Sequence, residues 1–184
     1  LSQAQNTNAN TDWRLKIKLA PQAKYFYNSA TPSDLMWPLR SNGGTDGVIF
    51  PYTPTIAMNY RSYYEVSDLI HTNYKQYFYK NSSVEEITIT ADFTAQDTQE
   101  ANYMLAVMTF FRSATKMFYG QDAQRGAPPP LVFLNGLGQY QFNNHPCLVN
   151  QFNYNLPDGV DYIRAGANSI NGTNLLTQRN RNTQ

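Results

Sequence analysis

Alternation of apolar and polar residues predicts two strands. Between residues 13 and 19 every second side chain is apolar, and the positions between them are cationic. Residues 84–93 alternate in the same way, with Ile89 on the apolar side. A period of two is typical of half-buried strands, and the two polar faces, one basic and one acidic, would be complementary if the strands were neighbours. The first strand has Trp13, Leu15, Ile17 and Leu19 on its apolar face; the second has Glu86, Thr88, Thr90 and Asp92 on its polar face.

One long helix is predicted over about 95–119. Apolar residues recur there at intervals of three and four, which is the spacing of a helix face. Thr94, Asp97 and Thr98 are all competent N-caps, and Gly120 is a suitable stop. The apolar stripe is broad, so we expect the helix to be covered on more than one side, with Phe111 buried in the helix and Ile89 buried in the strand.

Shorter signals complete the predicted architecture. Residues 25–27 suggest a short strand, and residues 131–142 a hairpin with its turn at 135–138. Residues 145–154 predict a last strand, and residues 60–80 predict extended pieces with loops. The polar ends have little to bury, which predicts a flexible arm over 1–11, one β domain over 12–164, and a polar tail or linker over 165–184.

Composition points to an interaction protein. The 184 residues include only 15% charged side chains, with a formal net charge of +1, so a strongly basic nucleic-acid binder is excluded. No run of about 18 apolar residues is present, which predicts no membrane insertion. The chain has 14 tyrosines, a residue type enriched in interfaces, although a tyrosine-rich sheet with an ordinary core is the competing interpretation. Within the aromatic cluster of residues 60–79, Tyr74 and Tyr77 are the candidate subunit contacts.

The sequence offers no convincing catalytic, cofactor or metal site. One cysteine rules out an internal disulfide and a cysteine-based zinc site. His71 follows Asp68 by three residues, a pair that is common by chance. His145 and Cys147 would share a strand face, but no third group to orient them is evident. We therefore expect no catalytic residues, no bound cofactor and no metal ligands.

The order of several segments resembles a known family. Residues 50–56, 69–74, 85–93 and 100–107 are followed by a proline-rich loop at 126–130 and by residues 140–142 and 154–163. In this order they resemble the tube-initiating baseplate proteins of contractile-tailed bacteriophages, which have the tail-tube fold. The resemblance covers most of the chain but not its ends, and a further strand would be expected after Ile163.

This resemblance implies a mainly β (α+β) protein, an antiparallel β-sandwich or barrel of tail-tube type with one long flanking helix. It implies a non-enzymatic virion protein of the phage tail, assembled in the host cytoplasm. Six copies would form a ring at the baseplate end of the tail tube, in contact with other tube proteins and the baseplate hub. Tube initiator, tube protein and another baseplate component all remain open.

Genomic DNA would pass through such a ring without sequence-specific binding. A wall that does not retain DNA should carry little net positive charge, because each neutralised phosphate adds affinity. The neutral-to-acidic face with Glu86, Thr88, Thr90 and Asp92 is therefore predicted to line the channel. The alternative function is a glycan-binding β-sandwich module, because tyrosine platforms with Asn and Gln also bind sugars.

Overall fold

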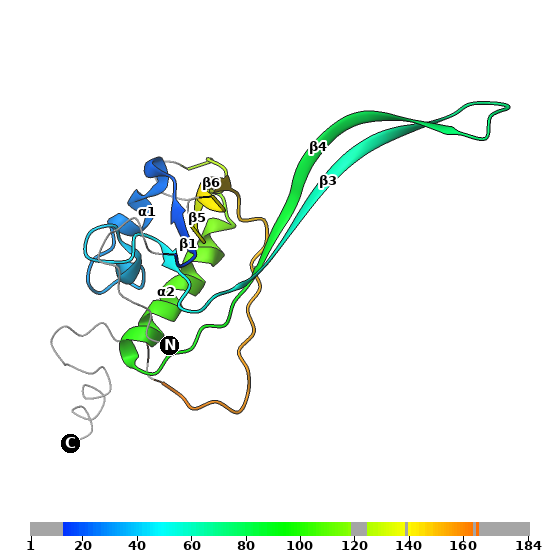
Figure 1. Cartoon of the computed structure of the whole chain (residues 1–184). Helices are drawn as coiled ribbons and strands as arrows, with labels where there is room; N and C mark the ends of the chain where they lie inside the picture. Colours follow the sequence, from blue (N-terminus) through cyan, green and yellow to red (C-terminus); the bar gives the residue numbers. More distant parts are fainter. Residues whose placement is uncertain (1–12, 119–124, 139, 164, 166–184) are drawn as a thin grey trace, which may run out of the picture. The chain divides into compact units, whose positions relative to one another are not determined.

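The computed structural model describes residues 13–118, 125–138, 140–163 and 165 (Figure 1). It is mostly β, with two antiparallel sheets and few helices, as the α+β prediction required. Neither sheet closes into a barrel among the described residues. The chain divides into two compact units, one formed by Thr53–Asp92 and the other by Leu1–Tyr52 with Phe93–Gln184. The predicted arm, nearly all of the predicted tail, and Gly120 lie outside the described residues.

The larger unit contains a four-stranded antiparallel sheet with the order β2-β1-β5-β6. Its core includes Leu15, Leu19 and Leu134, which are at most 2% exposed. Trp13, predicted to point inward with them, is 66% exposed, because it precedes the first paired residue of β1. The strands are β1 (Lys16–Leu19), β2 (Val48–Ile49), β5 (Val132–Gly136) and β6 (Phe142–Cys147).

Two glycines allow neighbouring backbone to approach β1 closely. Gly47 and Gly136 have φ of +111° and +134°, which L side chains rarely adopt. A Cβ at Gly136 would lie 2.7 Å from the Arg14 carbonyl oxygen, and one at Gly47 would collide with the Ile17 carbonyl oxygen. Both positions therefore require glycine for close packing of the sheet.

The long helix is α2 (Thr98–Ala114), five residues shorter at its end than predicted. Of the three candidate N-caps, Asp97 caps the helix, because its carboxylate accepts a hydrogen bond from the Glu100 backbone N–H at 2.8 Å, and the helix begins at Thr98 and not near residue 95. Beyond Ala114, Phe118 makes backbone hydrogen bonds outside the helix. Its N–H donates to the Ala127 carbonyl, and its carbonyl accepts from the Gly126 N–H. Phe111 is 8% exposed, so its predicted burial is confirmed.

The predicted strand at 25–27 is wrong, because these residues form the short helix α1 (Tyr25–Asn28). Three consecutive aromatic residues fit either period, so the pattern could not decide between strand and helix. The helical turn places Tyr27 fully inside the core. Two 3-10 turns flank it in the chain, η1 (Pro21–Ala23) and η2 (Trp37–Leu39).

The smaller unit is a long antiparallel hairpin of β3 (Thr55–Asp68) and β4 (Lys75–Thr90). Residues 60–80 were predicted as extended pieces, and the hairpin that joins them was missed. The predicted strand of residues 84–93 ends at Thr90 and pairs with β3, so it is not a neighbour of β1. Only six residues connect β3 to β4, so this pairing costs less loop-closure entropy than a pairing of β4 with the distant β1. Ile89, predicted to be buried, is only partly covered.

Only the beginning of the strand predicted over residues 145–154 is present. A hairpin forms from β5 and β6, but its return strand is Phe142–Cys147 and not the predicted 139–142, and Asn135 and Gly136 of the predicted turn belong to β5. Residues 148–163 contain no helix or strand. The ring of Phe152 instead stacks on Phe111 of α2, with centroids 5.1 Å apart. No helix among the described residues has the length and apolar character needed to span a membrane.

Candidate interaction surface

The hairpin of β3 and β4 has one apolar and one polar face. Directly opposed residues share a face, as in the pairs Ile56–Ile89 and Met58–Ile87. Both irregularities in the register insert the extra residue into β4, so alternation along β3 is unbroken. The apolar face consists of Ile56, Met58, Tyr60, Tyr64, Val66, Tyr77, Tyr79, Val84, Ile87 and Ile89, with Ser62 and Ser82 as its only polar pair within this stretch.

The apolar face is largely exposed within one chain. The side chains of Tyr60, Tyr64, Tyr77 and Tyr79 are 73%, 55%, 64% and 60% exposed. At about 150–250 Å² for each aromatic residue, these four alone expose about 400–600 Å². That matches the largest apolar patch of a typical monomer, about 300–600 Å², before the valines and isoleucines are added. The apolar face is therefore suited to a partner.

Contacts within the apolar face fix its side chains in place. The rings of Tyr64 and Tyr79 meet edge to face, with centroids 5.7 Å apart. The Tyr79 hydroxyl donates to the Ser82 hydroxyl at 3.0 Å, and the Ser82 and Ser62 hydroxyls lie 2.9 Å apart. Aromatic side chains held in one arrangement lose less entropy on binding than free ones do.

The polar face pairs its charges. Arg61 lies 3.4 Å from Glu85, and Lys80 lies 3.3 Å from Glu65. The Tyr63 hydroxyl donates to Glu85, and this hydrogen bond is the main reason that the pKa of Tyr63 is raised. These pairs are solvent-exposed and contribute little to stability, but they leave the face without a surplus of positive charge.

The structure distributes the predicted channel-lining residues unevenly. Thr88 and Thr90 lie on the polar face, opposite Ala57 and Thr55. Glu86 lies in the bulged stretch of β4, and Asp92 lies beyond the end of the strand. All four are exposed. Whether they face a channel stays a prediction.

The two predicted contact tyrosines occupy different places. Tyr77 is paired with Val66 on the apolar face. Tyr74 is 83% exposed and lies in the connection between the strands, where its backbone bonds the Thr72 hydroxyl. The pairing of Tyr77 with β3 was not predicted. Its signal was present in the apolar residues at even-numbered positions from Ile56 to Val66, interrupted by Ser62.

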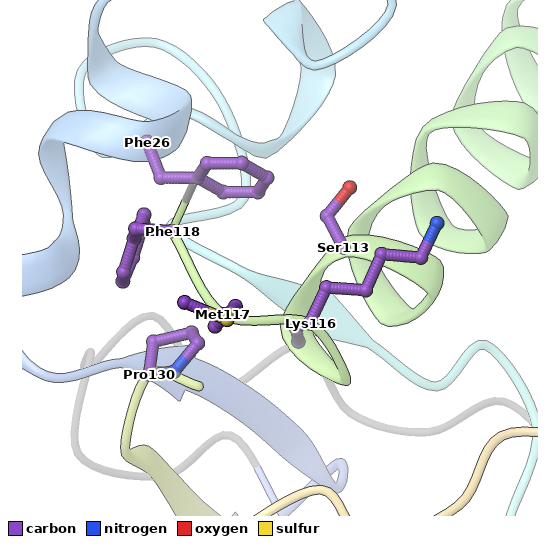
Figure 2. Close-up of a pocket in the computed structure, with 7 residues that line it drawn as sticks. Phe26, Ser113, Lys116, Met117, Phe118 and Pro130 are labelled. Atoms are coloured by element: carbon purple, nitrogen blue, oxygen red, sulfur yellow. The ribbon is translucent and has the colours of Figure 1, made fainter. Parts of the chain in front are cut away.

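A pocket lies between α1, the end of α2 and Pro130, which precedes β5 (Figure 2). Its volume is about 230 Å³. Lys116 is exposed beside it, and its described walls contain no histidine or carboxylate that could act as a base. The wall residues are Phe26, Ser113, Ala114, Lys116, Met117, Phe118 and Pro130.

His145 and Cys147 lie together in β6, whereas His71 belongs to the other unit. His71 lies in the connection between the hairpin strands with φ of +62°, whereas His145 lies in β6, where its ring meets Phe142. Burial raises the pKa of Cys147, which disfavours the nucleophilic thiolate. Among the described residues, no three His, Cys, Asp or Glu side chains form a group that could hold a metal ion.

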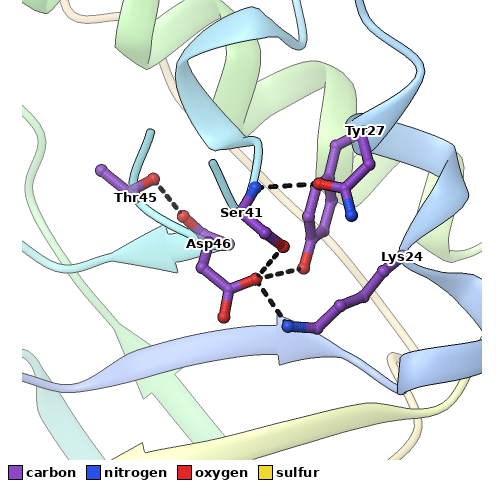
Figure 3. Close-up of polar contacts among 7 residues, drawn as sticks. Lys24, Tyr27, Ser41, Thr45 and Asp46 are labelled. Carbon is purple, nitrogen blue, oxygen red and sulfur yellow. Dashed lines mark hydrogen bonds and ion pairs between the residues drawn. The ribbon is translucent and has the colours of Figure 1, made fainter. Parts of the chain in front are cut away.

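Asp46 organises the most connected polar cluster of the larger unit (Figure 3). Its carboxylate accepts hydrogen bonds from Lys24 at 2.7 Å, Tyr27 at 3.1 Å and Ser41 at 2.5 Å. Burial alone would raise the pKa of Asp46, but these bonds outweigh it and hold the pKa below its ordinary value. The pKa of Tyr27 is raised, mainly by burial and next by the negative charge of Asp46. The cluster ties α1 to the loop before β2 and is structural.

Comparison with known proteins assigns no family. No family model matches the chain, and no curated protein or solved structure is significantly similar to it.

Proposed function

We propose that this chain is a non-enzymatic structural protein of a contractile phage tail. Copies of it form a ring, six in number by the resemblance, at the baseplate end of the tail tube. The ring initiates or continues the tube and lines the DNA channel. The proposed β-sandwich or barrel of tail-tube type closes only when copies assemble. Other tube proteins and the baseplate hub are its neighbours in the virion.

The observation that carries the proposal is the long, two-faced hairpin of β3 and β4. An isolated two-stranded hairpin is marginally stable in water, and this one exposes most of both faces. Its two outer edges have backbone groups that can pair with another chain. Such an element can associate with copies of itself, and a head-to-tail interface between copies gives a ring when its rotation closes.

The two faces suit the two sides of a tube wall. The polar face, with Thr88 and Thr90, pairs its charges within the face and so suits a channel through which DNA slides. The apolar face suits burial against protein. For Thr88 and Thr90 this assignment agrees with the predicted channel-lining position, whereas for Glu86, in the bulged stretch, and Asp92, beyond the strand, that position stays a prediction.

The proposal is tested by the mass and shape of the purified chain. Size-exclusion chromatography with light scattering should give a mass of six copies, and negative-stain images should show rings with a central hole. A chain that stays monomeric at every concentration and in the presence of other tube proteins would refute it. Glycan arrays test the alternative function, because a glycan-binding module should bind sugars as an isolated monomer, whereas a tube protein should have no such affinity.

A further inference from the structure

Residues 148–163, here called the extended segment, form no helix or strand (Figure 1), and several of their apolar side chains are exposed. The side chains of Tyr154, Leu156, Val160 and Tyr162 are each more than half exposed. Apolar side chains recur along the segment between its Asn and Asp residues. The extended segment therefore offers apolar contact area to a partner.

The backbone of the extended segment also lacks partners. No hydrogen bond joins it to any other residue in the part of the chain that the structure describes. Its one described ring contact with the body is the stack of Phe152 on Phe111. The Tyr154 ring stacks in turn on Phe152, with centroids 5.7 Å apart, and among the described residues beyond it the side chains of Leu156, Val160 and Tyr162 are left exposed to meet another molecule.

The extended segment matches the apolar face of the hairpin in chemistry and is short enough to lie along it. The 11 residues after Phe152 span at most about 36 Å, and the 14 residues of β3 span about 48 Å. Pro157 and Gly159, with φ of +77°, bend the segment in its middle. The bend disfavours its addition as a continuous strand at a sheet edge and favours the docking of side chains on a face.

We propose that the extended segment of one copy lies across the apolar face of the hairpin of a neighbouring copy. This inference rests on the proposed ring and names the contact that builds it. Each copy then carries both halves of a head-to-tail interface, as a closed ring requires. The exposed area of the apolar face approaches the roughly 800 Å² per partner of a standard interface. Tyr154 and Leu156 pack on the tyrosines of the hairpin on one side of the bend, and Val160 and Tyr162 pack on the other.

A complementation experiment with two full-length variants tests this contact. The hairpin variant carries Tyr64→Lys and Tyr79→Lys, and the segment variant carries Leu156→Asp and Val160→Asp. All four side chains are more than half exposed, so both variants should fold, which circular dichroism and thermal melting verify. The matched control carries Asn153→Asp and Asn155→Asp, which add the same charge to the segment without removing apolar contacts.

The expected result is that each variant alone stays monomeric, while their equimolar mixture forms a species of two copies. In that species the intact segment of the hairpin variant docks on the intact hairpin of the segment variant. The control should form rings at concentrations within about threefold of the unmodified chain, and hydrogen exchange at residues 153–163 should slow on assembly.

Other outcomes overturn the inference in distinguishable ways. If the unmodified chain forms rings and the segment variant does so equally well, the contact is wrong and the ring stands. If both variants and their mixture stay monomeric, the contact is not made between copies as described. If the unmodified chain never assembles, the proposed function fails, and this inference fails with it.

Discussion

The hydroxyl of Tyr103 in α2 makes two hydrogen bonds with the backbone of Ile49 in the edge strand β2. It accepts from the Ile49 N–H and donates to the Ile49 carbonyl, each at 2.8 Å. A tyrosine hydroxyl thus takes the place of a neighbouring strand at this residue. Burial raises the pKa of Tyr103, in keeping with a neutral hydroxyl that both donates and accepts.

Tyr103→Phe should lower the free energy of unfolding by about 1–3 kcal/mol, because both backbone groups of Ile49 lose their partner. Urea unfolding followed by fluorescence measures the change. Tyr60→Phe is the matched control, since Tyr60 is 73% exposed on the hairpin, and it should change stability by less than about 0.5 kcal/mol. Equal effects of the two substitutions would contradict a role for the Tyr103 hydroxyl.

Asp46→Asn should lower the free energy of unfolding at pH 7 by about 1–2 kcal/mol, because Lys24 loses its charged hydrogen-bond acceptor. The effect stays this small because both side chains are partly exposed to water. Asn tolerates the positive φ of 51° at this position, so the backbone should be kept.

The same substitution has a pH signature. The folded-state pKa of Asp46 lies below its ordinary value, so its stabilisation is fully present above the unfolded-state pKa of about 4. It is lost as the pH falls through the lower folded-state value. Unfolding measured from pH 7 down to pH 2 should therefore show a shallower acid loss in Asp46→Asn. Asp158→Asn, at an exposed loop residue, should leave the acid profile unchanged.

Phe111→Ala should cost about 3–5 kcal/mol, because the ring is buried between Phe110 and Phe152 and its removal leaves a cavity. The comparison is Tyr140→Ala, where the side chain is 95% exposed. Thermal or chemical unfolding of both variants gives the difference. A loss below about 1 kcal/mol for Phe111→Ala would show that this face of α2 is not part of the core.

Joint replacement of Tyr74 and Tyr77 by Ala should weaken ring formation while the monomer stays folded. Both side chains are exposed, so little of the monomer's packing is removed. Light scattering over a dilution series measures the loss of assembly. The control replaces Thr88 and Thr90 with Ala on the polar face. Unchanged assembly of the tyrosine variant would remove these residues from the interface.

A density map of the assembled ring tests the assignment of the hairpin faces. The side chains of Thr88 and Thr90, with Glu86 and Asp92, should point into the channel. Thr88→Lys with Thr90→Lys should then make rings retain DNA in a salt-dependent way, because each cation that meets a phosphate releases counterions. Side chains that point to the outer surface or into a subunit interface would refute the assignment even if rings form.

Local patterns determined several elements of this protein without any knowledge of the fold. Alternation predicted β1, and the apolar stripe predicted α2 and the burial of Phe111, with Asp97 among the three candidate caps. The glycine-containing segment predicted a hairpin after β5, although not the bounds of its return strand β6. These signals lie within short stretches of chain, where spacing and capping act directly.

Tertiary packing decided what local patterns left open. Tyr27 enters the core only because α1 turns it inward, and Phe152 leaves a predicted strand to stack on Phe111. The hydroxyl of Tyr103 reaches Ile49 across 54 positions of the sequence, a distance over which no periodicity operates. The apolar side of the hairpin became evident only when pairing with β3 set the register of β4, since register decides which face each side chain joins.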